Sequence, residues 1–443
     1  MVGHRRHQPP ARPQAHGPGV PWQASAGHSG PIGQHGPDHP GPGHPVPWHS
    51  GGHPAAPHLI PQGYLPAPHQ GPAASPGWSP RRILAVIGVS VLSGALLLML
   101  LIALIVLGPA GMVLVPLAAV PVLVISTAIW LIDRWRPQPL LLTALCLLWG
   151  SVVSVLMTLV LGLGADIAYQ LGQGEAPGMV SAVVFAPMIE ETTKATLLLV
   201  IVLAARRHLD GPFRGLMFGS LIGLGFGFTE DLLYMGTATL EGGAAAGGAI
   251  FILRGILTPF AHVVFTGVIG LLLGLGARRA GAGWPVGMFA VGLPAGMVLH
   301  GVWNLVAGST DDQPLVTVLA AGLMGLMCFA GWVGAALVLR NQEVISTGRM
   351  LREYVHFGWL TPGEAELFSS RAGRRRALAW AGRFPGAKPI MRRMIRISAV
   401  LAALRLRIRR NPRGTRTEAL EERRLLEELG RLRARMLRGA GLG

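Results

Sequence analysis

Four apolar stretches of this sequence each contain a small group of polar or ionisable residues. The groups are Glu190-Glu191-Thr192-Thr193-Lys194, Phe226-Gly227-Phe228-Thr229-Glu230-Asp231, the set Arg254, Thr258, Pro259 and His262, and His300-Gly301-Val302-Trp303-Asn304. Ionisable side chains are costly in an apolar helix, and they usually face a protein interior or water. Carboxylates, imidazoles and an amide can together activate a water and stabilise an oxyanion, which hydrolysis of a peptide bond requires.

The spacing of these residues indicates how they meet. Glu190 and Lys194 are four residues apart, so on a helix they share a face and can form an ion pair. His300 and Asn304 have the same spacing. A buried glutamate is a plausible general base, and Lys194 would give the two adjacent glutamates unlike surroundings.

Glycines at every fourth position accompany three of the groups. They are Gly219, Gly223 and Gly227 before Glu230, Gly270 and Gly274 in line with Arg254, Thr258, His262 and Thr266, and Gly292 and Gly296 before His300. Small residues at this spacing let helix backbones approach closely. The polar groups are therefore predicted to point toward neighbouring helices and to converge in the outer half of a bilayer.

The elements that carry these groups are long apolar runs. The chain of 443 residues is 51% hydrophobic and 13% charged, with a mean hydropathy of +0.47. A soluble domain needs more charge, and each run is long enough to cross about 30 Å of hydrocarbon. We predict an all-α, polytopic transmembrane helix bundle of about eight spans. The predicted spans are 83–107, 111–132, 139–163, 178–204, 213–236, 249–275, 286–307 and 315–339.

Loop charges predict the orientation of the bundle. The loops on one side contain Arg134 and Arg136, Arg206 and Arg207, and Arg278 and Arg279. Those on the other side contain Asp166, Glu175, Glu241, Asp311 and Asp312, with no Lys or Arg. This alternation follows the positive-inside rule and predicts a multi-pass protein of the cell membrane with both termini cytoplasmic.

The flanking segments differ from the predicted membrane domain at 80–340. Residues 1–79 are rich in Pro, Gly and His and are predicted to be a disordered cytoplasmic tail. They contain eleven of the fifteen histidines, but the irregular spacing specifies no metal geometry. Residues 341–443 hold 23 basic and 9 acidic residues, which indicates contact with anionic lipid and not with nucleic acid.

The basic tail at 341–443 is predicted to be helical. Thr361-Pro362-Gly363-Glu364 has the pattern of a capping box with proline at the first helical position. Residues 391–410 alternate Arg with Ile, Leu and Met, which fits a helix lying on the inner leaflet. Residues 418–437 carry Leu at helical spacing, which fits a short coiled coil or a docking helix.

The four polar motifs together resemble those of the PrsW family of intramembrane proteases. The matching residues are Glu190-Glu191-x-x-Lys194, Phe226-x-x-x-Glu230, Arg254 with Pro259-x-x-His262, and His300-x-x-x-Asn304. The family is similar to the prenyl-protein (CAAX) endopeptidases. The resemblance covers roughly residues 180–310. Asp231 departs from it, because the family often has Asn at that position.

The resemblance implies a protease site made of these residues. Our assignment makes Glu190 the base or water ligand, held by Glu191 and Lys194, with Glu230 and His262 orienting the water. His300 and Asn304 would donate to the oxyanion. Alternatively, His262, His300 and a glutamate such as Glu190 bind one divalent metal ion, with zinc as the first candidate. The family resemblance points to a metalloprotease and its CAAX relatives to a metal-free glutamate mechanism, so both alternatives stay open.

The expected function is hydrolysis of peptide bonds in membrane proteins, such as a single-span anti-sigma factor, near the outer half of the bilayer. An endopeptidase for prenylated or lipidated peptides is an alternative, but Glu230 stands where those relatives usually have His. A proton- or cation-coupled transporter is another, but the sequence shows no clear inverted repeat. An inactive scaffold is disfavoured by the intact motifs.

The predicted topology can be tested with reporter fusions. Fusions after Arg136, Arg207, Arg279 and Arg340 should read as cytoplasmic, and fusions near Glu175, Glu241 and Asp311 should read as external. The reason is the strict alternation of loop charge. One external readout among the arginine fusions would refute the eight-span arrangement.

Overall fold

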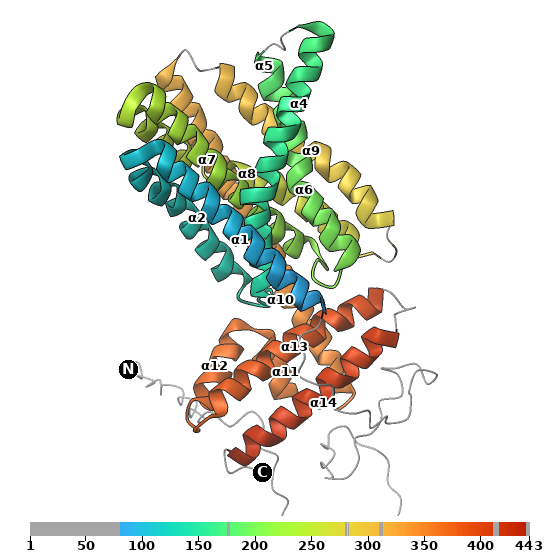
Figure 1. Cartoon of the computed structure of the whole chain (residues 1–443). Helices are drawn as coiled ribbons and strands as arrows, with labels where there is room; N and C mark the ends of the chain where they lie inside the picture. The colour runs from blue at the N-terminus through green and yellow to red at the C-terminus, as the bar shows by residue number, and fades with distance from the viewer. Residues whose placement is uncertain are drawn as a thin grey trace, which may run out of the picture. The chain divides into compact units, whose positions relative to one another are not determined.

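The computed structural model of the protein describes residues 80–174, 178–279, 281, 283–309, 313–410 and 416–439. Every regular element among these residues is helical, which confirms the predicted all-α class (Figure 1). The predicted disordered tail at 1–79 lies outside the described residues, and so do Glu175, Asp311 and Asp312.

The described helices follow the predicted apolar runs closely. They are α1 (Pro80–Leu107), η2 (Gly108–Ala110), α2 (Gly111–Asp133), α3 (Leu140–Leu148), η3 (Trp149–Ser154), α4 (Val155–Gln173), α5 (Gly178–Val180), η4 (Ser181–Phe185), α6 (Ala186–Ala204), α7 (Pro212–Ile250), η5 (Phe251–Leu257), α8 (Ala261–Ala277), α9 (Gly283–Ser309), α10 (Pro314–His356), α11 (Pro362–Ser369), α12 (Arg371–Ala381), α13 (Ala387–Arg410) and α14 (Arg416–Gly439). The segments η3, η4 and η5 are π-helical.

Five of the described ranges are long and apolar enough to cross a membrane, judged by length and composition. They are Arg82–Asp133, Leu140–Gly172, Pro212–Ala277, Gly283–Ser309 and Pro314–His356. The first and third each contain two successive long helices, α1 with α2 and α7 with α8. Helix α6, which carries Glu190, Glu191 and Lys194, is not among the five. The count of eight spans and the cytoplasmic termini stay predictions.

Helix α7 differs from its predicted span. We expected the span to end at 236, but α7 continues to Ile250. The chain bends inside it at Gly243, whose φ of 75° is outside helical geometry. Glycine adopts this left-handed conformation without the steric cost that a side chain would add. The segment between 236 and 249, which we expected to connect two spans, is therefore mostly helical, with one sharp bend at Gly243.

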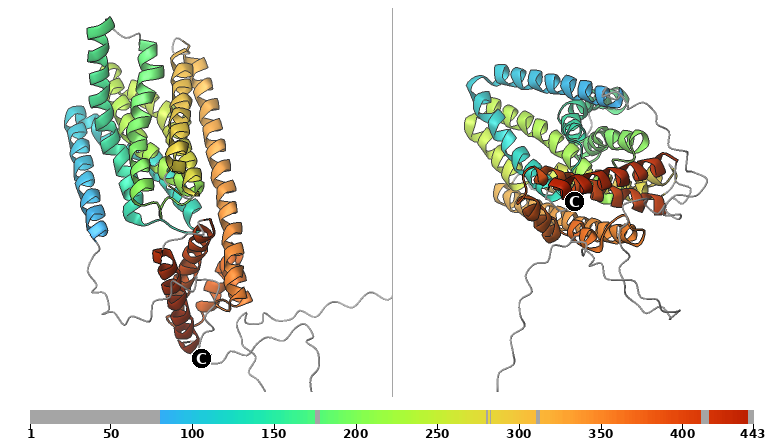
Figure 2. Two further views of the ribbon diagram at one scale, coloured as in Figure 1. Left: turned by 90° about the vertical axis from the view of Figure 1, so that its right-hand side faces the viewer. Right: turned by 90° about the horizontal axis from the view of Figure 1, so that it is seen from below.

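The helices form two compact units. One contains Pro66–Thr347 and Ala399–Leu425, and the other contains Gly348–Ser398 and the chain from Leu426 on. In the first unit, α7 lies at the centre, in contact with α8 on one side and with α2, α3 and η3 elsewhere. Figure 2 shows the long helices of this unit running side by side. Its core includes Leu198 of α6, Phe218 and Ile222 of α7, and Ile269 of α8, all fully buried.

Glycines let α7 and α8 pack backbone to backbone. A Cβ atom on Gly219 would lie 2.3 Å from the carbonyl oxygen of Thr266, and one on Gly223 would lie 2.1 Å from that of His262. No side chain fits at such distances, so these positions require glycine. This confirms the predicted packing faces. It also fixes the polar residues of the two helices against each other.

Charged residues join the helices at the end of the first unit that carries the loop arginines. Arg136, after α2, donates to both carboxylate oxygens of Asp210 at 2.7 and 2.9 Å. Burial raises the pKa of Asp210, but the charge and hydrogen bonds of Arg136, together with the charges of Arg214 and Arg407, outweigh it and hold this pKa below its usual value. Arg214 at the start of α7 lies 3.4 Å from Asp133. The ion pairs therefore tie the end of α2 to the start of α7.

The second unit confirms two predictions for the basic tail. The Thr361 hydroxyl accepts a hydrogen bond from the Glu364 amide, and the Glu364 carboxylate accepts one from the Thr361 amide. This is the predicted capping box. Helix α14 buries Leu429 and pairs Arg433 with Glu364 at 2.6 Å, so it is a docking helix, one of the two predicted alternatives.

Helix α13 corrects a third prediction. We expected residues 391–410 to lie with their apolar face in lipid. The apolar side chains are instead buried in the protein, among them Met391, Met394, Leu401 and Leu404. Amphipathic periodicity predicts that one face of a helix is covered, but it does not say whether lipid or protein covers it.

The packing of α7 against α8 can be tested at Gly215, one turn from Gly219 and away from the polar residues. A Cβ atom there would lie 1.8 Å from the carbonyl oxygen of Gly270. Gly215→Ala should lower the free energy of unfolding in detergent by about 1–3 kcal/mol through overpacking. Gly331→Ala is the control, because a Cβ atom there has nothing within 4 Å. Equal stability of the two variants would contradict the packing described.

Candidate active site

The polar residues of α6 surround a buried ammonium group. The Lys194 Nζ atom lies 3.1 Å from Glu190 Oε2 and 2.8 Å from Glu191 Oε1, which confirms the predicted pairing on one helix face. It also lies 3.1 Å from the Nδ1 atom of His262 on α8. The ring of Phe226 covers it, with its centroid at 3.8 Å. The lysine side chain is fully buried, so these groups replace its hydration shell.

A second ionic group lies beside this one and joins α7 to η5 and α8. The Nε2 atom of His262 lies 2.6 Å from Glu230 Oε2. The guanidinium of Arg254, on η5, donates to Glu230 and, at 2.6 Å, to Asp231. Glu230 is therefore held by an imidazole and an arginine at once. Lys194 on the Nδ1 atom and Glu230 on the Nε2 atom fix the ring of His262 between them.

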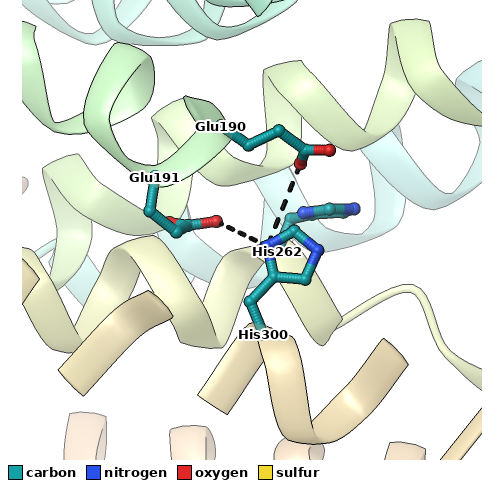
Figure 3. Close-up of side chains that lie close together, drawn as sticks. All are labelled: Glu190, Glu191, His262 and His300. Carbon is teal, nitrogen blue, oxygen red and sulfur yellow. Dashed lines mark hydrogen bonds and ion pairs between the residues drawn. The ribbon is translucent and has the colours of Figure 1, made fainter. Parts of the chain in front are cut away.

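Glu191 connects the lysine to α9. Its Oε1 atom lies 3.1 Å from the Nδ1 atom of His300, and its Oε2 atom accepts a hydrogen bond of 2.9 Å from the Thr266 hydroxyl. Figure 3 shows Glu190 and Glu191 reaching from one helix toward His300. Glu190 is the more distant, at 3.9 Å. Phe265 stacks on the His300 ring with centroids 4.8 Å apart, which fixes its plane.

The three π-helical segments all touch this cluster. Trp149 of η3 donates to the backbone carbonyl of Thr193 on α6 at 3.2 Å. The carbonyl of Ala182 in η4 accepts a 2.8 Å hydrogen bond from Asn304. Segment η5 carries Arg254. A π-helical turn shifts the side chains that follow it around the helix, and such turns are frequent at functional sites.

A cavity of about 460 Å³ opens beside the cluster. Glu190, Glu230, His262, His300 and Asn304 all line it, whereas Glu191 and Lys194 do not. The predicted site residues thus fall into two groups. The residues that line the cavity can contact a substrate or a water. Glu191 and Lys194 do not line it, and they hold the lining residues in place through hydrogen bonds.

Among the glutamates, Glu190 is the least constrained. Glu191 contacts Lys194, His300 and Thr266, and its side chain is fully buried. Glu190 makes one hydrogen bond, to Lys194, and it faces the cavity. A general base needs a carboxylate that can reach a water and accept its proton. Glu190 meets this requirement best.

The negative charges of the cluster outnumber its positive charges. Four carboxylates, those of Glu190, Glu191, Glu230 and Asp231, face two permanent cations, Lys194 and Arg254. Buried charges need compensation, so two further positive charges are called for. Two protons or one divalent metal ion would supply them.

Four residues of the cluster could hold a metal ion. One donor atom from each of Glu190, Glu191, His262 and His300 lies within 4.8 Å of the others. Carboxylates and imidazoles are suitable zinc ligands. However, the hydrogen bonds from Lys194 to Nδ1 and from Nε2 to Glu230 engage both nitrogens of His262. The donor types therefore fit a metal held by Glu190 and His300, and His262 could join only if Lys194 moved.

The structure brings the predicted site residues together, with one difference in detail. Asn304 lines the cavity, but its amide also donates to the backbone of η4, a contact that the sequence did not indicate. Sequence reasoning placed Arg254, Asp231 and Thr266 near the site without giving them a role. The structure gives each a role, because each holds one of the glutamates or their arginine partner.

Comparison with known families gives one match. Residues 138–341 match the model for the PrsW family intramembrane metalloprotease. No curated protein and no solved structure matches the chain. The match contains every cavity-lining residue of the cluster and confirms the resemblance that the four motifs indicate. Together with the apolar helices, it makes this a membrane protein with an intramembrane protease domain.

Proposed function

We propose that this chain, in which residues 138–341 form a PrsW family intramembrane protease domain, cuts the membrane-spanning segments of other proteins. One observation carries the proposal. Glu190, Glu230, His262 and His300 line a cavity of about 460 Å³, and Lys194 and Glu191 hold them from behind. A cavity of that size accommodates a short length of extended peptide.

Glu190 is the general base in this proposal. It takes a proton from the water that attacks the scissile carbonyl and later delivers it to the departing amine. Glu230 is less suited to this step, because Arg254 and His262 already occupy its carboxylate. Instead, Glu230 positions the water, and His262, whose ring nitrogens contact Lys194 and Glu230, holds Glu230 in place. Lys194 is a positioning residue, since it orients Glu190 and His262 without lining the cavity.

His300 and Asn304 are assigned to the oxyanion that forms on the scissile carbonyl. Both line the cavity and lie on α9, with His300 beside the carboxylates of α6. Asn304 uses one amide N–H on the carbonyl of Ala182, and a carboxamide has a second. This contact holds the side chain still, as an oxyanion donor requires.

The substrate that we propose is a single-span membrane protein of the anti-sigma-factor type, cut in the outer half of the bilayer. Support comes from the apolar part of the cavity wall, which includes Pro121, Val122, Ala186 and Leu224. Such a wall suits the side chains of a membrane-spanning segment.

A metal-assisted form of the same reaction is the second candidate. It is favoured by the missing positive charge in the cluster and by the metalloprotease description of the family. Glu190 and His300 would hold a divalent ion such as zinc, and the ion would supply a Lewis acid for the attacking water. In this form Lys194 and Glu230 keep their positioning roles.

Replacement of the proposed base tests the function. Glu190→Gln keeps the shape of the side chain but removes the base, so cleavage should fall by about 10²–10⁴-fold. The measurement is cleavage of candidate single-span proteins by purified enzyme in lipid bilayers. Thr192→Val on the exposed side of α6 is the matched control and should cleave normally. Wild-type cleavage by a folded Glu190→Gln variant would refute the proposed protease site.

Metal content separates the two forms of the mechanism. If glutamate acts without a metal, chelation should leave cleavage unchanged while Glu190→Gln stays inactive. If a metal takes part, chelation should abolish cleavage, and His300→Ala should lose the ion measured by elemental analysis. The first result overturns the metal-assisted form, and the second overturns the glutamate form.

A further inference from the structure

Six arginines line a second cavity, which shares no lining residue with the one beside the protease residues. They are Arg206, Arg207, Arg278, Arg279, Arg407 and Arg410. The cavity has a volume of about 280 Å³ and lies where α6, α8 and α13 end and α14 begins; we call it the arginine pocket. All its lining residues belong to the compact unit that contains Pro66–Thr347 and Ala399–Leu425.

Three acidic residues, Asp210, Glu418 and Glu421, also line the arginine pocket, and they leave part of this charge uncompensated. Asp210 is bound by Arg136, which lies outside the pocket, at 2.7 and 2.9 Å. Arg407 lies 3.9 Å from Asp210 and 3.8 Å from Glu418. The other five arginines of the pocket, which include Arg278 and Arg410, have no carboxylate within 4.0 Å among the described residues. The pocket therefore has a surplus of positive charge.

Two of these arginines repel each other. Burial lowers the pKa of Arg278, and the nearby charge of Arg410 lowers it further. Burial also lowers the pKa of Arg206 and of Arg410. Cations that are held close together gain stability when an anion binds between them. The guanidinium group is especially suited to phosphate, because its planar N–H groups bind two oxygens at once.

The residues near the arginine pocket indicate which kind of molecule carries the phosphate group. Arg279, in the same pocket, stacks on the ring of Trp284 at 3.8 Å from the centroid, and Trp284 is half exposed. Tryptophan gathers at the boundary between membrane and water. Arg206, Arg207, Arg278 and Arg279 are the loop residues that predict the cytoplasmic side of the bundle. Basic pockets between helices at that level bind lipid headgroups.

We propose that the arginine pocket binds the phosphate headgroup of an anionic phospholipid in the inner leaflet. The headgroup would join the end of α8 to the end of α13, since Arg278 and Arg410 lie on those two elements. This would give the predicted contact of the basic tail with anionic lipid a defined site. The proposal does not depend on the protease chemistry.

The test uses the full-length protein in a mild detergent micelle. Adding phosphatidylglycerol should raise the unfolding temperature by several degrees, and phosphatidylcholine should not. Arg278→Gln with Arg410→Gln should weaken phosphatidylglycerol binding by about 10–30-fold. Arg278→Lys with Arg410→Lys, which keeps the charge but loses the paired N–H groups, should weaken binding less than the glutamine variant does.

The matched control is Arg375→Gln with Arg392→Gln, which removes the same charge from two exposed arginines outside the pocket. It should bind phosphatidylglycerol like the wild type. If the pocket variant does not fold, the exposed Arg207→Gln serves instead and should weaken binding severalfold.

Three results would overturn the proposal. The pocket variants could bind phosphatidylglycerol as tightly as the wild type. The control could lose as much binding as the pocket variant, which would show a response to net charge alone. Inorganic phosphate could raise the unfolding temperature as much as the lipid does, which would identify a free anion as the ligand.

Discussion

The buried ammonium of Lys194 is the interaction on which the site depends. It contacts Glu190 and Glu191 from its own helix and His262 from α8, and it has no access to water. Removing one partner of a buried ion pair typically costs about 3–5 kcal/mol, because the remaining charge is left without compensation. The close glycine contacts of α7 with α8 serve this interaction, since they hold His262 and Glu230 at the level of Lys194.

The same lysine gives the two glutamates different roles. Glu191 is enclosed by Lys194, Thr266 and His300, so its carboxylate is fully used in holding α6, α8 and α9 together. Glu190 shares the lysine but faces the cavity and has capacity left for a water. The two glutamates are adjacent and chemically identical, and their positions alone make Glu191 structural and Glu190 reactive.

The sequence was sufficient to predict which side chains share a face. Spacing of four residues predicted the Glu190–Lys194 pair, and the glycines predicted the packing face of α7, because both depend only on helix periodicity. It was not sufficient to predict partners across helices. The bond from Asn304 to η4 depends on the π-helical turn there, and no residue pattern indicated that turn.

Helix periodicity also could not predict whether lipid or protein covers the apolar face of a helix. Helix α13 has the arginine and leucine pattern of a lipid-facing helix, yet protein covers Met391 and Leu401. The capping box at Thr361 was predicted correctly, because a cap depends on four consecutive residues. Local signals were therefore reliable, and errors arose where a distant segment decided the environment.

The most direct test of this account compares Glu190→Gln with Glu191→Gln in cleavage rate and unfolding temperature, measured on the same purified samples. The account predicts that Glu190→Gln does not cleave and keeps more stability than Glu191→Gln, because Lys194 still has Glu191 as a partner. Glu191→Gln should lower the unfolding temperature, because Lys194 and His300 lose their shared partner. The opposite pattern, with a stable inactive Glu191→Gln and an active Glu190→Gln, would contradict the assignment of the reactive glutamate.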